Sequence, residues 1–411
     1  MIFASPRTCV ALLSLPISIA FTPHRTQLPM ASAPTWLSEP FCLPLSKSGP
    51  PPYCVWTSRD FRNGRGISII ATPEAANTLA SSKWFMNAHL IANTSPSHSQ
   101  PPGYQVTPLP RRGLGLIANS TYKRGDLLMQ EAPLVLSSLS LENSHLGERE
   151  QGRLYRTATS RLPVASRKRV MGLHGHPDTT SVHDRFKANA FNVFDFAALF
   201  PAVARMNHDC RPNAAFYFDK HTFTQKIKAV RDIGPGEEIT ISCTSVPSTL
   251  AGRRKTDMSD VLTSIRWTDL SHYLPSAERS RRMHHHWGFT CTCHLCSSST
   301  SQIAASDARL HRIRELEVLI YHAHSQPLAS GTENTTDSTL LAEELFNLYK
   351  EERLDGALAR PYDSLVAAWQ NRGEGGRERA RAYAEAGVKA ARLWPGPRSA
   401  EGARMQSVLG V

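Results

Sequence analysis

The nine residues RMNHDCRPN at positions 205–213 and the six residues CTCHLC at positions 291–296 determine how this chain is interpreted. Together they contain Cys210, Cys291, Cys293 and Cys296, a complete thiolate set for a structural zinc ion. Four buried free thiols could also simply pack. The tight CxCxxC spacing favours metal, and a thiolate zinc site can contribute on the order of 10 kcal/mol to folding. We therefore predict a zinc ion that joins two segments about eighty residues apart.

These stretches also carry a family resemblance. The segment NHDCRPN resembles the NHSCxPN signature of SET-domain protein lysine methyltransferases, and WGFTCTCHLC at 287–296 resembles their post-SET zinc loop. Upstream, RRGLGLIANSTYKRGDLL at 111–128 resembles the opening strands and the S-adenosylmethionine loop. VRDIGPGEEITIS at 230–242 follows the same pattern, with GPGEE as a strong turn signal. The chain resembles a fungal-type member of this family.

The resemblance implies an α+β fold. We expect a β-rich SET domain of short strands with a knotted-loop signature, a post-SET zinc site, and an all-α, TPR-like C-terminal domain. We expect a leader at 1–52, a strand and helix extension with a linker at 53–103, a SET domain at 104–300 and helices at 304–411. Within the SET domain we expect a variable insert at 137–188, an inserted loop at 244–267 and the post-SET segment at 287–298.

The insert at 137–188 contains no cysteine, so the Cys-rich MYND finger of a related subfamily is absent. His174, His176 and His183 lie within the insert and could ligate a metal. Without cysteine or acidic partners at helical spacing, surface histidines are the simpler interpretation. The apolar residues that we expect to be buried in this insert are Leu154, Leu162, Val164, Val170 and Met171.

The tail beyond residue 304 has the sequence pattern of α-helices. Helical spacing separates the apolar residues Leu310, Ile313, Leu316 and Ile320. Three later stretches, separated by Gly and Pro, show the same pattern. Four helices are therefore predicted. The aromatic residues of the tail are expected to form its core rather than to contact a ligand; they are Phe346, Tyr349, Trp369, Tyr383 and Trp394.

The resemblance also implies where S-adenosylmethionine would bind. Arg112, Gly113, Leu114 and Gly115 match the loop whose backbone approaches the cofactor, where a Cβ would block that approach. Asn189, Asn207 and His208 match the residues that hydrogen-bond its methionine part and adenine, and Phe289 matches the aromatic that covers the adenine. Taken alone, the glycines fit a plain β-turn and Asn207 with His208 fits a satisfied loop pair.

Two departures from the family pattern bear on catalysis. Asp209 replaces the usual Ser, which a surface loop tolerates. Cys243 stands where a tyrosine normally contributes its ring and hydroxyl to the methyl-transfer channel, and Cys lacks the aromatic face and the strong donor. The polar stretch that follows is interpreted as an inserted loop or an unspliced intron in the gene model. Tyr273 or Trp267 could substitute for the missing tyrosine.

The bulk composition is that of a globular protein with a basic surface. The 411 residues are 41% hydrophobic and 20% charged, and the net charge of +12 favours an acidic partner such as chromatin. Eight cysteines with four clustered at metal spacing do not resemble a secreted disulfide framework, which indicates a reducing compartment. The remaining Cys9, Cys42, Cys54 and Cys243 are expected to be single thiols. Residues 8–21 form an apolar run compatible with a signal peptide but too short to span a membrane. We expect a protein of the nucleus and/or the cytoplasm, neither exported nor membrane-bound.

The first hypothesis is a SET methyltransferase that transfers a methyl group from S-adenosylmethionine to a lysine of a protein, histone or non-histone. The second is a catalytically impaired SET protein that acts as an interaction module, which the missing tyrosine favours. A zinc-dependent nucleic-acid binder fits less well, because CTCHLC lacks a second Cys or His pair and no aromatic and basic stripe accompanies it. We expect a monomer without direct sequence-specific nucleic-acid binding.

Overall fold

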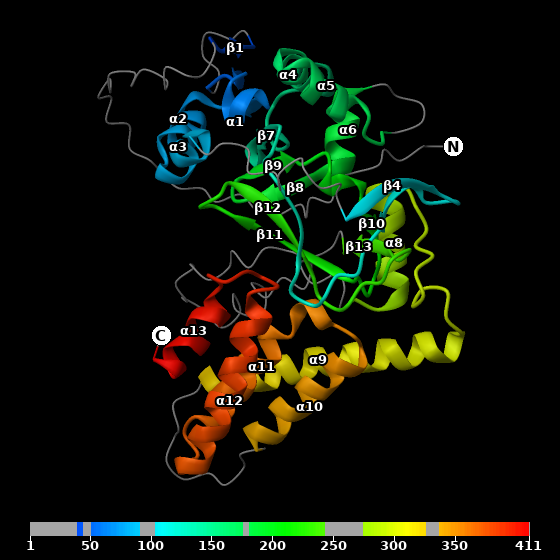
Figure 1. The fold of residues 1–411 in the computed structure, drawn as a ribbon, viewed down its shortest axis with the longest axis vertical. Helices are drawn as coiled ribbons and strands as arrows, with labels where there is room; N and C mark the ends of the chain where they lie inside the picture. The colour runs from blue at the N-terminus through cyan, green and yellow to red at the C-terminus, as the bar shows by residue number, and fades with distance from the viewer. Residues whose placement is uncertain are drawn as a thin grey trace.

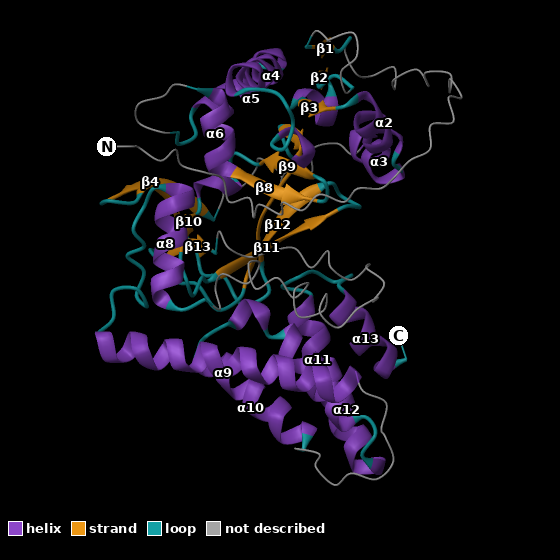
Figure 2. Cartoon of the chain, turned by 180° about the vertical axis from the view of Figure 1, so that it is seen from behind, coloured by secondary structure: helices purple, strands orange, loops and turns teal. Residues whose placement is uncertain are grey.

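The described part of the chain contains three β-sheets, with helices packed around them and a further group of helices at the C-terminus. The computed structural model describes residues 39–43, 51–90, 103–175, 181–242, 274–325 and 337–410. Figure 1 shows the sheets in one half of the molecule, with α4, α5 and α6 beside them, and the helices α9 to α13 packed together at the other end. The same division is visible from behind in Figure 2. This arrangement confirms the predicted α+β fold with a helical C-terminal region.

The largest sheet has six strands. Its spatial order is β1 (Phe41–Cys42), β2 (Cys54–Ser58), β3 (Ile67–Ala71), β7 (Val135–Ser138), β9 (Phe196–Leu199) and β8 (Ala190–Val193). Strands β2 and β3 are buried at every position, because helices cover them. The helix α4 packs across both strands, and the Ser68 hydroxyl donates a 2.7 Å hydrogen bond to the Ala158 carbonyl of that helix. The short helices α1 (Phe61–Gly64), α2 (Pro73–Ser81) and α3 (Lys83–Leu90) complete this region.

One cysteine prediction is wrong. Cys42 and Cys54 are not single thiols but form a disulfide between β1 and β2. The antiparallel register places the two residues directly opposite each other, with their Cα atoms 4.0 Å apart. The twelve-residue separation of these cysteines carries no recognisable motif, so only the strand pairing makes their proximity evident. Cys9 and Cys243 lie outside the described residues.

Two smaller sheets carry the conserved-looking motifs. One has the order β10 (Asn207–His208), β13 (Glu238–Ile241), β5 (Gly113–Ala118) and β4 (Tyr104–Leu109). The other has the order β11 (Ala214–Asp219), β12 (Thr224–Ala229) and β6 (Leu127–Glu131). The predicted short antiparallel strands and the turn between β12 and β13 are confirmed, with Gly236 in the left-handed region at φ +82°. Because β12 and β13 join different sheets, that turn connects the two sheets.

The insert forms helices that cover the large sheet. They are η1 (Leu139–Leu141), α4 (Glu148–Arg161), α5 (Val164–Met171) and α6 (Val182–Asn189). Leu154, Leu162 and Val170 are buried as expected. The predictions for Val164 and Met171 are wrong, since these side chains are 53% and 40% exposed. The face of α5 that packs inward carries Ser166 and Val170, four residues apart, which leaves its first and last residues in solvent.

The insert histidines do not form a metal cluster in the described part of the chain. His183 is buried and its ring stacks on Tyr155, with the ring centroids 4.6 Å apart. His174 is exposed, and His176 lies outside the described residues. The interpretation as a surface histidine fits His174 and is wrong for His183, which packs inside the insert.

The C-terminal region consists of stacked helices around their own core. The elements are α9 (Thr300–Ser325), α10 (Ser338–Glu351), η6 (Asp355–Ala357), α11 (Ala359–Trp369), α12 (Gly373–Ala391) and α13 (Ala400–Leu409). The preceding helix α8 (Ser276–Trp287) is not part of this core, since its Met283 and Trp287 pack with Cys210, Cys291 and Cys293. The four predicted helices α9 to α12 are confirmed, and α13 was not predicted. Leu310, Ile313, Leu316 and Ile320 are all buried in the core between the helices.

The tail aromatics pack against this core, as predicted. Tyr349 is fully buried, while Phe346, Trp369, Tyr383 and Trp394 are half-buried against it. Trp394 also lines two cavities at the boundary with the sheets, so it has a second environment that the sequence did not indicate. Among the described residues, no helix combines the length and the apolar character that crossing a membrane requires.

Candidate cofactor and zinc site

The four predicted zinc cysteines lie together. The sulfur atoms of Cys210, Cys291, Cys293 and Cys296 are all within 4.8 Å of one another. Cys210 Sγ is 4.0 Å from Cys291 Sγ and 3.6 Å from Cys296 Sγ. Zn–S bonds of about 2.3 Å in a tetrahedron place sulfur atoms about 3.8 Å apart, so this set fits a zinc ion. Within the described ranges, no other group of three or more His, Cys, Asp or Glu side chains could hold a metal.

The surroundings of the cysteine cluster suit metal ligation by thiolate. Cys210, Cys291 and Cys293 are buried, and Met283, Trp287, Phe289 and Leu295 pack around the cluster. Hydrogen bonds from the thiols of Cys210 and Cys291 lower the pKa of Cys296 to about 7. Hydrogen bonds with the other three thiols raise the pKa of Cys210, so four thiolates at this density would need a cation for compensation, which a zinc ion would supply. The helix α8, which ends at Gly288 in the left-handed conformation, delivers the chain into the CTCHLC segment.

The glycines of the predicted cofactor loop occupy the turn between β4 and β5. Gly113 has φ +68° and open space where a Cβ would be. A Cβ on Gly115 would lie 2.5 Å from Leu109 Cδ1 and 2.9 Å from both Asn207 Nδ2 and Glu238 Oε1. Gly115 therefore allows β5 to approach the NHDC loop closely. Leu114, between the two glycines, is 41% exposed. The backbone at Gly113 and Leu114 is therefore exposed, so a ligand could approach it from solvent.

The polar residues of the NHDC loop are held by β13 and by the cofactor loop. Asn207 Nδ2 donates a 2.8 Å hydrogen bond to Glu238 Oε1, and Arg112 Nη2 donates a 3.0 Å bond to the His208 carbonyl. Arg112 also forms an ion pair with Glu238 at 3.4 Å. The Arg112 side chain thus ties the cofactor loop to β10 and β13. Glu238 is a site residue that the sequence interpretation did not assign, although GPGEE had been noted as a turn.

His208 connects the NHDC loop to the zinc cluster and to Phe289. Its ring is buried, its Nε2 lies 3.5 Å from Cys210 Sγ, and its centroid is 6.1 Å from that of Phe289. An unbroken series of contacts therefore runs from Gly115 through Asn207 and His208 to Phe289. Phe289 is half-buried, so part of its ring remains open to a ligand.

The side chain of Asn189 hydrogen-bonds to residues of the insert at 137–188. It is the last residue of α6, and its Nδ2 donates to the carbonyls of His174 and Arg185 at 2.8 and 2.7 Å. Its cofactor role stays a prediction. Cys243, Tyr273 and Trp267 lie outside the described residues, as does the whole polar stretch between β13 and residue 274.

The loop that bears Cys210 is fixed on several sides. Asn213 is buried, donates to Glu237 Oε1 and to the Glu238 carbonyl, and accepts from the Thr240 amide. Asp209 is half-buried rather than fully exposed, and its carboxylate accepts the Arg211 amide at 2.8 Å. Burial is the main cause that raises the pKa of Asp209, to about 6. The sequence interpretation did not foresee these contacts.

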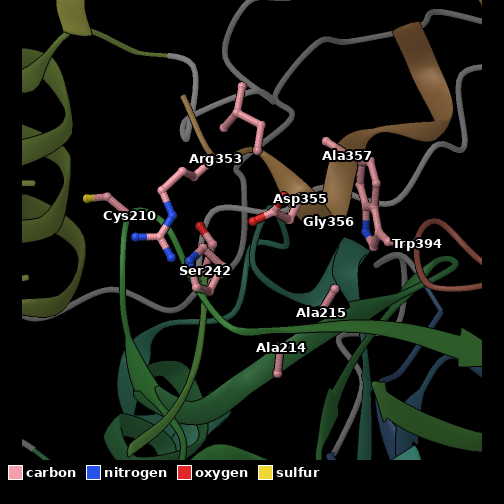
Figure 3. Close-up of a pocket in the computed structure, with 11 residues that line it drawn as sticks. Cys210, Ala214, Ala215, Ser242, Arg353, Asp355, Gly356, Ala357 and Trp394 are labelled. Atoms are coloured by element: carbon pink, nitrogen blue, oxygen red, sulfur yellow. The ribbon is translucent and has the colours of Figure 1, made fainter. Parts of the chain in front are cut away.

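The same loop borders a small cavity of about 50 Å³ at the C-terminal helices. Its lining includes Cys210, Ser242, Arg353, Asp355 and Trp394. In Figure 3 the Arg353 side chain extends between Cys210 and Ser242, and Asp355 and Trp394 stand along the other side. Ser242 is the last described residue before Cys243, which itself lies outside the described residues.

A second cavity of about 260 Å³ lies between β11 and the segment after α12. It is lined by the aromatic residues Phe194, Phe216 and Phe218 on one side and by Trp394 on the other. Two of its lining residues, Asn192 and Gln225, have side-chain oxygens that are buried and accept no hydrogen bond within the described structure. The cavity combines apolar walls with unused acceptors, which suits a peptide segment.

Comparison with known proteins identifies the domain that holds this site. The SET domain family matches residues 113–244. This chain carries a SET domain. The matched range includes the Gly113–Gly115 turn, the NHDC loop and the GPGEE turn. It ends at residue 244, where the polar stretch interpreted as an insertion begins.

Two relatives of the SET domain chain are lysine methyltransferases. The chain is 27% identical over 202 residues to histone-lysine N-methyltransferase set5 of Schizosaccharomyces pombe, covering 49% of this chain and 52% of the relative. It is 28% identical over 144 residues to N-lysine methyltransferase SMYD2 of Homo sapiens, covering 33% and 27%. The chain thus spans about half of the first relative's length and about a quarter of the second's.

Proposed function

We propose that this SET domain protein is a protein-lysine N-methyltransferase that uses S-adenosylmethionine. The observation that carries the proposal is the series of contacts from Gly115 through Asn207 and His208 to Phe289, beside the four zinc cysteines. A bare backbone turn, a polar pair and an aromatic ring are what a nucleoside cofactor with a charged amino-acid tail needs. The names of set5 and SMYD2 agree with this activity.

The chain's own residues would have separate tasks. The cysteine cluster would hold a zinc ion that keeps the Cys210 loop and the post-SET segment together. Arg112, Gly113, Leu114, Gly115, Asn207, His208 and Phe289 would hold the cofactor, with Asn189 a further predicted contact. When bound, S-adenosylmethionine supplies an electrophilic methyl group on a sulfonium. The site must then accept a lysine amine without its proton, since a free lysine has a pKa of about 10.4.

The larger cavity supports a protein substrate. Its aromatic walls could cover an aliphatic lysine stem or neighbouring apolar side chains, and the unused oxygens of Asn192 and Gln225 could accept peptide amides. The printed names of the relatives include a histone-lysine and a general lysine enzyme, so histone and non-histone proteins are both substrates to test. We further propose a monomer of the nucleus and/or the cytoplasm, with chromatin as a partner attracted by the net charge of +12.

A second candidate function follows from Cys243. With Cys in place of tyrosine, the protein could bind the cofactor but transfer methyl groups slowly, and its helical C-terminal region could serve as an interaction module. This alternative predicts cofactor binding without turnover. Replacing Cys243 by Tyr, alone and together with deletion of residues 244–267, separates an impaired enzyme from an active one.

The test is methyl transfer followed by mass spectrometry. Purified zinc-containing protein is incubated with S-adenosylmethionine and a pool of lysine peptides from histone and non-histone sequences. We expect a gain of one or more methyl groups on lysine, loss of that gain in Asn207→Ala, and no loss in Asn119→Ala, an exposed asparagine directly after the end of β5. No transfer by the wild type or by either tyrosine-restored protein, together with no cofactor binding, would contradict the proposal.

A further inference from the structure

A buried carboxylate of the C-terminal helices reaches into the loop that carries the cofactor and zinc residues. Glu352 follows the last residue of α10 and is 4% exposed. Its carboxylate accepts from Arg211 Nη2, from the Ser306 hydroxyl at 2.8 Å and from Arg309 Nε at 2.6 Å. Ser306 and Arg309 belong to α9. One carboxylate therefore joins two C-terminal helices to a residue 141 positions earlier in the chain.

Arg211 transmits this contact to the site. It lies between the zinc ligand Cys210 and Pro212, and its side chain is 10% exposed. Its Nη1 donates a 2.7 Å hydrogen bond to the Cys210 carbonyl, and its amide donates to Asp209 at 2.8 Å. The opposite side of the same loop is tied to β13 through Asn213. The loop is thus held by the sheet on one side and by Glu352 on the other.

The charge state of Glu352 fits this role. Burial acts to raise the pKa of the Glu352 carboxyl, but the charge of Arg211 and the hydrogen bonds from Arg211, Ser306 and Arg309 outweigh burial. They hold that pKa below its usual value, so the carboxylate is ionised near neutral pH. Removing one partner of such a buried pair leaves the other charge uncompensated, which is more disruptive than losing a surface pair.

The backbone at Glu352 is shaped for the contact. The next residue, Arg353, is in the left-handed conformation at φ +53°, a position where helices usually have glycine. The Leu354 amide bonds to the Tyr349 carbonyl and the Arg353 amide to the Lys350 carbonyl, each at 3.0 Å. This closes α10 sharply and turns Arg353 into the small cavity beside Cys210 and Ser242 (Figure 3). A strained, over-determined turn of this kind is typical of functional sites.

We propose that Glu352 is a positioning residue, which fixes the Asn207–Cys210 loop through Arg211 and so sets the affinity of the site for S-adenosylmethionine without touching it. This inference rests on the proposed function. It makes the C-terminal helices part of the cofactor site rather than a separate module, because the loop has its full set of anchors only when α9 and α10 are docked.

The test compares Glu352→Gln with a matched control on the same helix. Glu344 is also on α10 and also accepts from an arginine of α9, through two bonds of 2.7 and 2.8 Å from Arg312. Its side chain is 42% exposed, and within the described residues its polar contacts are with Arg312 and not with the Cys210 loop. Cofactor affinity is measured by calorimetry, zinc content by elemental analysis, and thermal unfolding in parallel. We expect Glu352→Gln to weaken S-adenosylmethionine binding at least tenfold with one zinc retained, and Glu344→Gln to change it less than twofold.

A double-mutant cycle isolates the pair. Arg211→Met should weaken cofactor binding to a similar extent, and the Arg211→Met/Glu352→Gln protein should bind no more weakly than the poorer single variant. Arg211→Lys keeps the positive charge but lacks the paired N–H donors of the guanidinium group. Its affinity for S-adenosylmethionine should therefore lie between those of the wild type and Arg211→Met. If Glu352→Gln does not fold, Arg211→Met and Arg211→Lys carry the same comparison.

Hydrogen exchange provides a readout that does not need the cofactor. Amides of residues 208–211 and of Asn213 should exchange at least tenfold faster in Glu352→Gln than in wild type, and at an unchanged rate in Glu344→Gln. Wild-type affinity and exchange in Glu352→Gln would overturn the inference while leaving the proposed function intact. If Glu352→Gln exchanges faster than wild type but the wild type binds no S-adenosylmethionine, the result would instead count against the proposed function.

Discussion

Asn207 donates a 2.8 Å hydrogen bond from its side-chain amide to Glu238, although the two residues are 31 positions apart and lie on different strands. The same carboxylate pairs with Arg112 of the β4–β5 turn at 3.4 Å. Glu238 is therefore the point at which three sequence motifs meet.

Glu238→Ala should weaken S-adenosylmethionine binding at least tenfold. Without the carboxylate, the Asn207 amide and the Arg112 guanidinium lose their shared acceptor, and both side chains become free to leave the site. Each lost bond of this type costs about 1–3 kcal/mol. Calorimetric titration of the variant measures the effect, and an affinity equal to that of the wild type would show that Glu238 does not order the site.

Gly115→Ala should abolish cofactor binding, whereas Gly234→Ala should not change it. A Cβ on Gly115 meets Leu109 at 2.5 Å, and moving Leu109 or Asn207 aside disturbs the β4–β5 turn. Gly234 has open space at its Cβ position and a φ outside the left-handed region, so alanine is accommodated there. Dissociation constants for S-adenosylmethionine, with unfolding curves as a folding check, compare the two. Equal affinities of the two variants for S-adenosylmethionine would show that Gly115 does not contribute to cofactor binding.

Cys293→Ser should lose the zinc ion and unfold the post-SET segment while the C-terminal helices stay folded. The remaining three thiols bind the metal more weakly, and a structural zinc of this type contributes on the order of 10 kcal/mol to local folding. Elemental analysis gives the zinc content, and hydrogen exchange locates the unfolded residues. Cys42→Ser, which removes a cysteine outside the cluster, should keep one zinc per chain. Full zinc occupancy in Cys293→Ser would contradict the assigned ligand set.

His183 should make the protein less stable as the pH falls below 6.5. Burial, followed by the nearby charge of Lys187, lowers the pKa of His183 to about 4, against an unfolded value of about 6.5. Between these values the unfolded chain binds a proton that the folded chain does not, so stability rises with pH across this window. From pH 7 to pH 5 the loss from this residue is about 2 kcal/mol.

The variant His183→Phe isolates that effect. Phenylalanine can keep the stacking contact with Tyr155 and cannot take up a proton. Urea unfolding at pH 7 and pH 5 should show a smaller loss in the variant than in the wild type, by about 2 kcal/mol. The acid sensitivity of the zinc site is common to both proteins and cancels in the comparison. Parallel losses in the two proteins would mean that His183 titrates normally in the fold.

The sequence allowed good predictions where the information is local. The CxCxxC spacing brings three ligands together by chain geometry alone, and helical spacing of Leu310, Ile313, Leu316 and Ile320 places them on one face. The same reasoning failed for Val164 and Met171, because α5 has only two turns and its buried face is chosen by what it packs against. Hydrophobicity alone does not specify that face.

Long-range pairings could not be predicted from local pattern. The Cys42–Cys54 disulfide depends on the register of two strands, and the Arg211–Glu352 contact depends on how the C-terminal helices dock. Neither residue pair has a spacing that marks it. Glu238 was visible in GPGEE, but its role arises only when β10, β13 and β5 lie side by side. Such contacts require the folded chain.

Native mass spectrometry of the purified protein with S-adenosylmethionine tests the central claim most directly. We predict one zinc ion and one S-adenosylmethionine on each wild-type chain, and neither on Cys291→Ser, because the metal would hold the Cys210 loop and the post-SET segment together. Folded wild-type protein that carries no zinc, or that carries zinc but never binds S-adenosylmethionine, would contradict it.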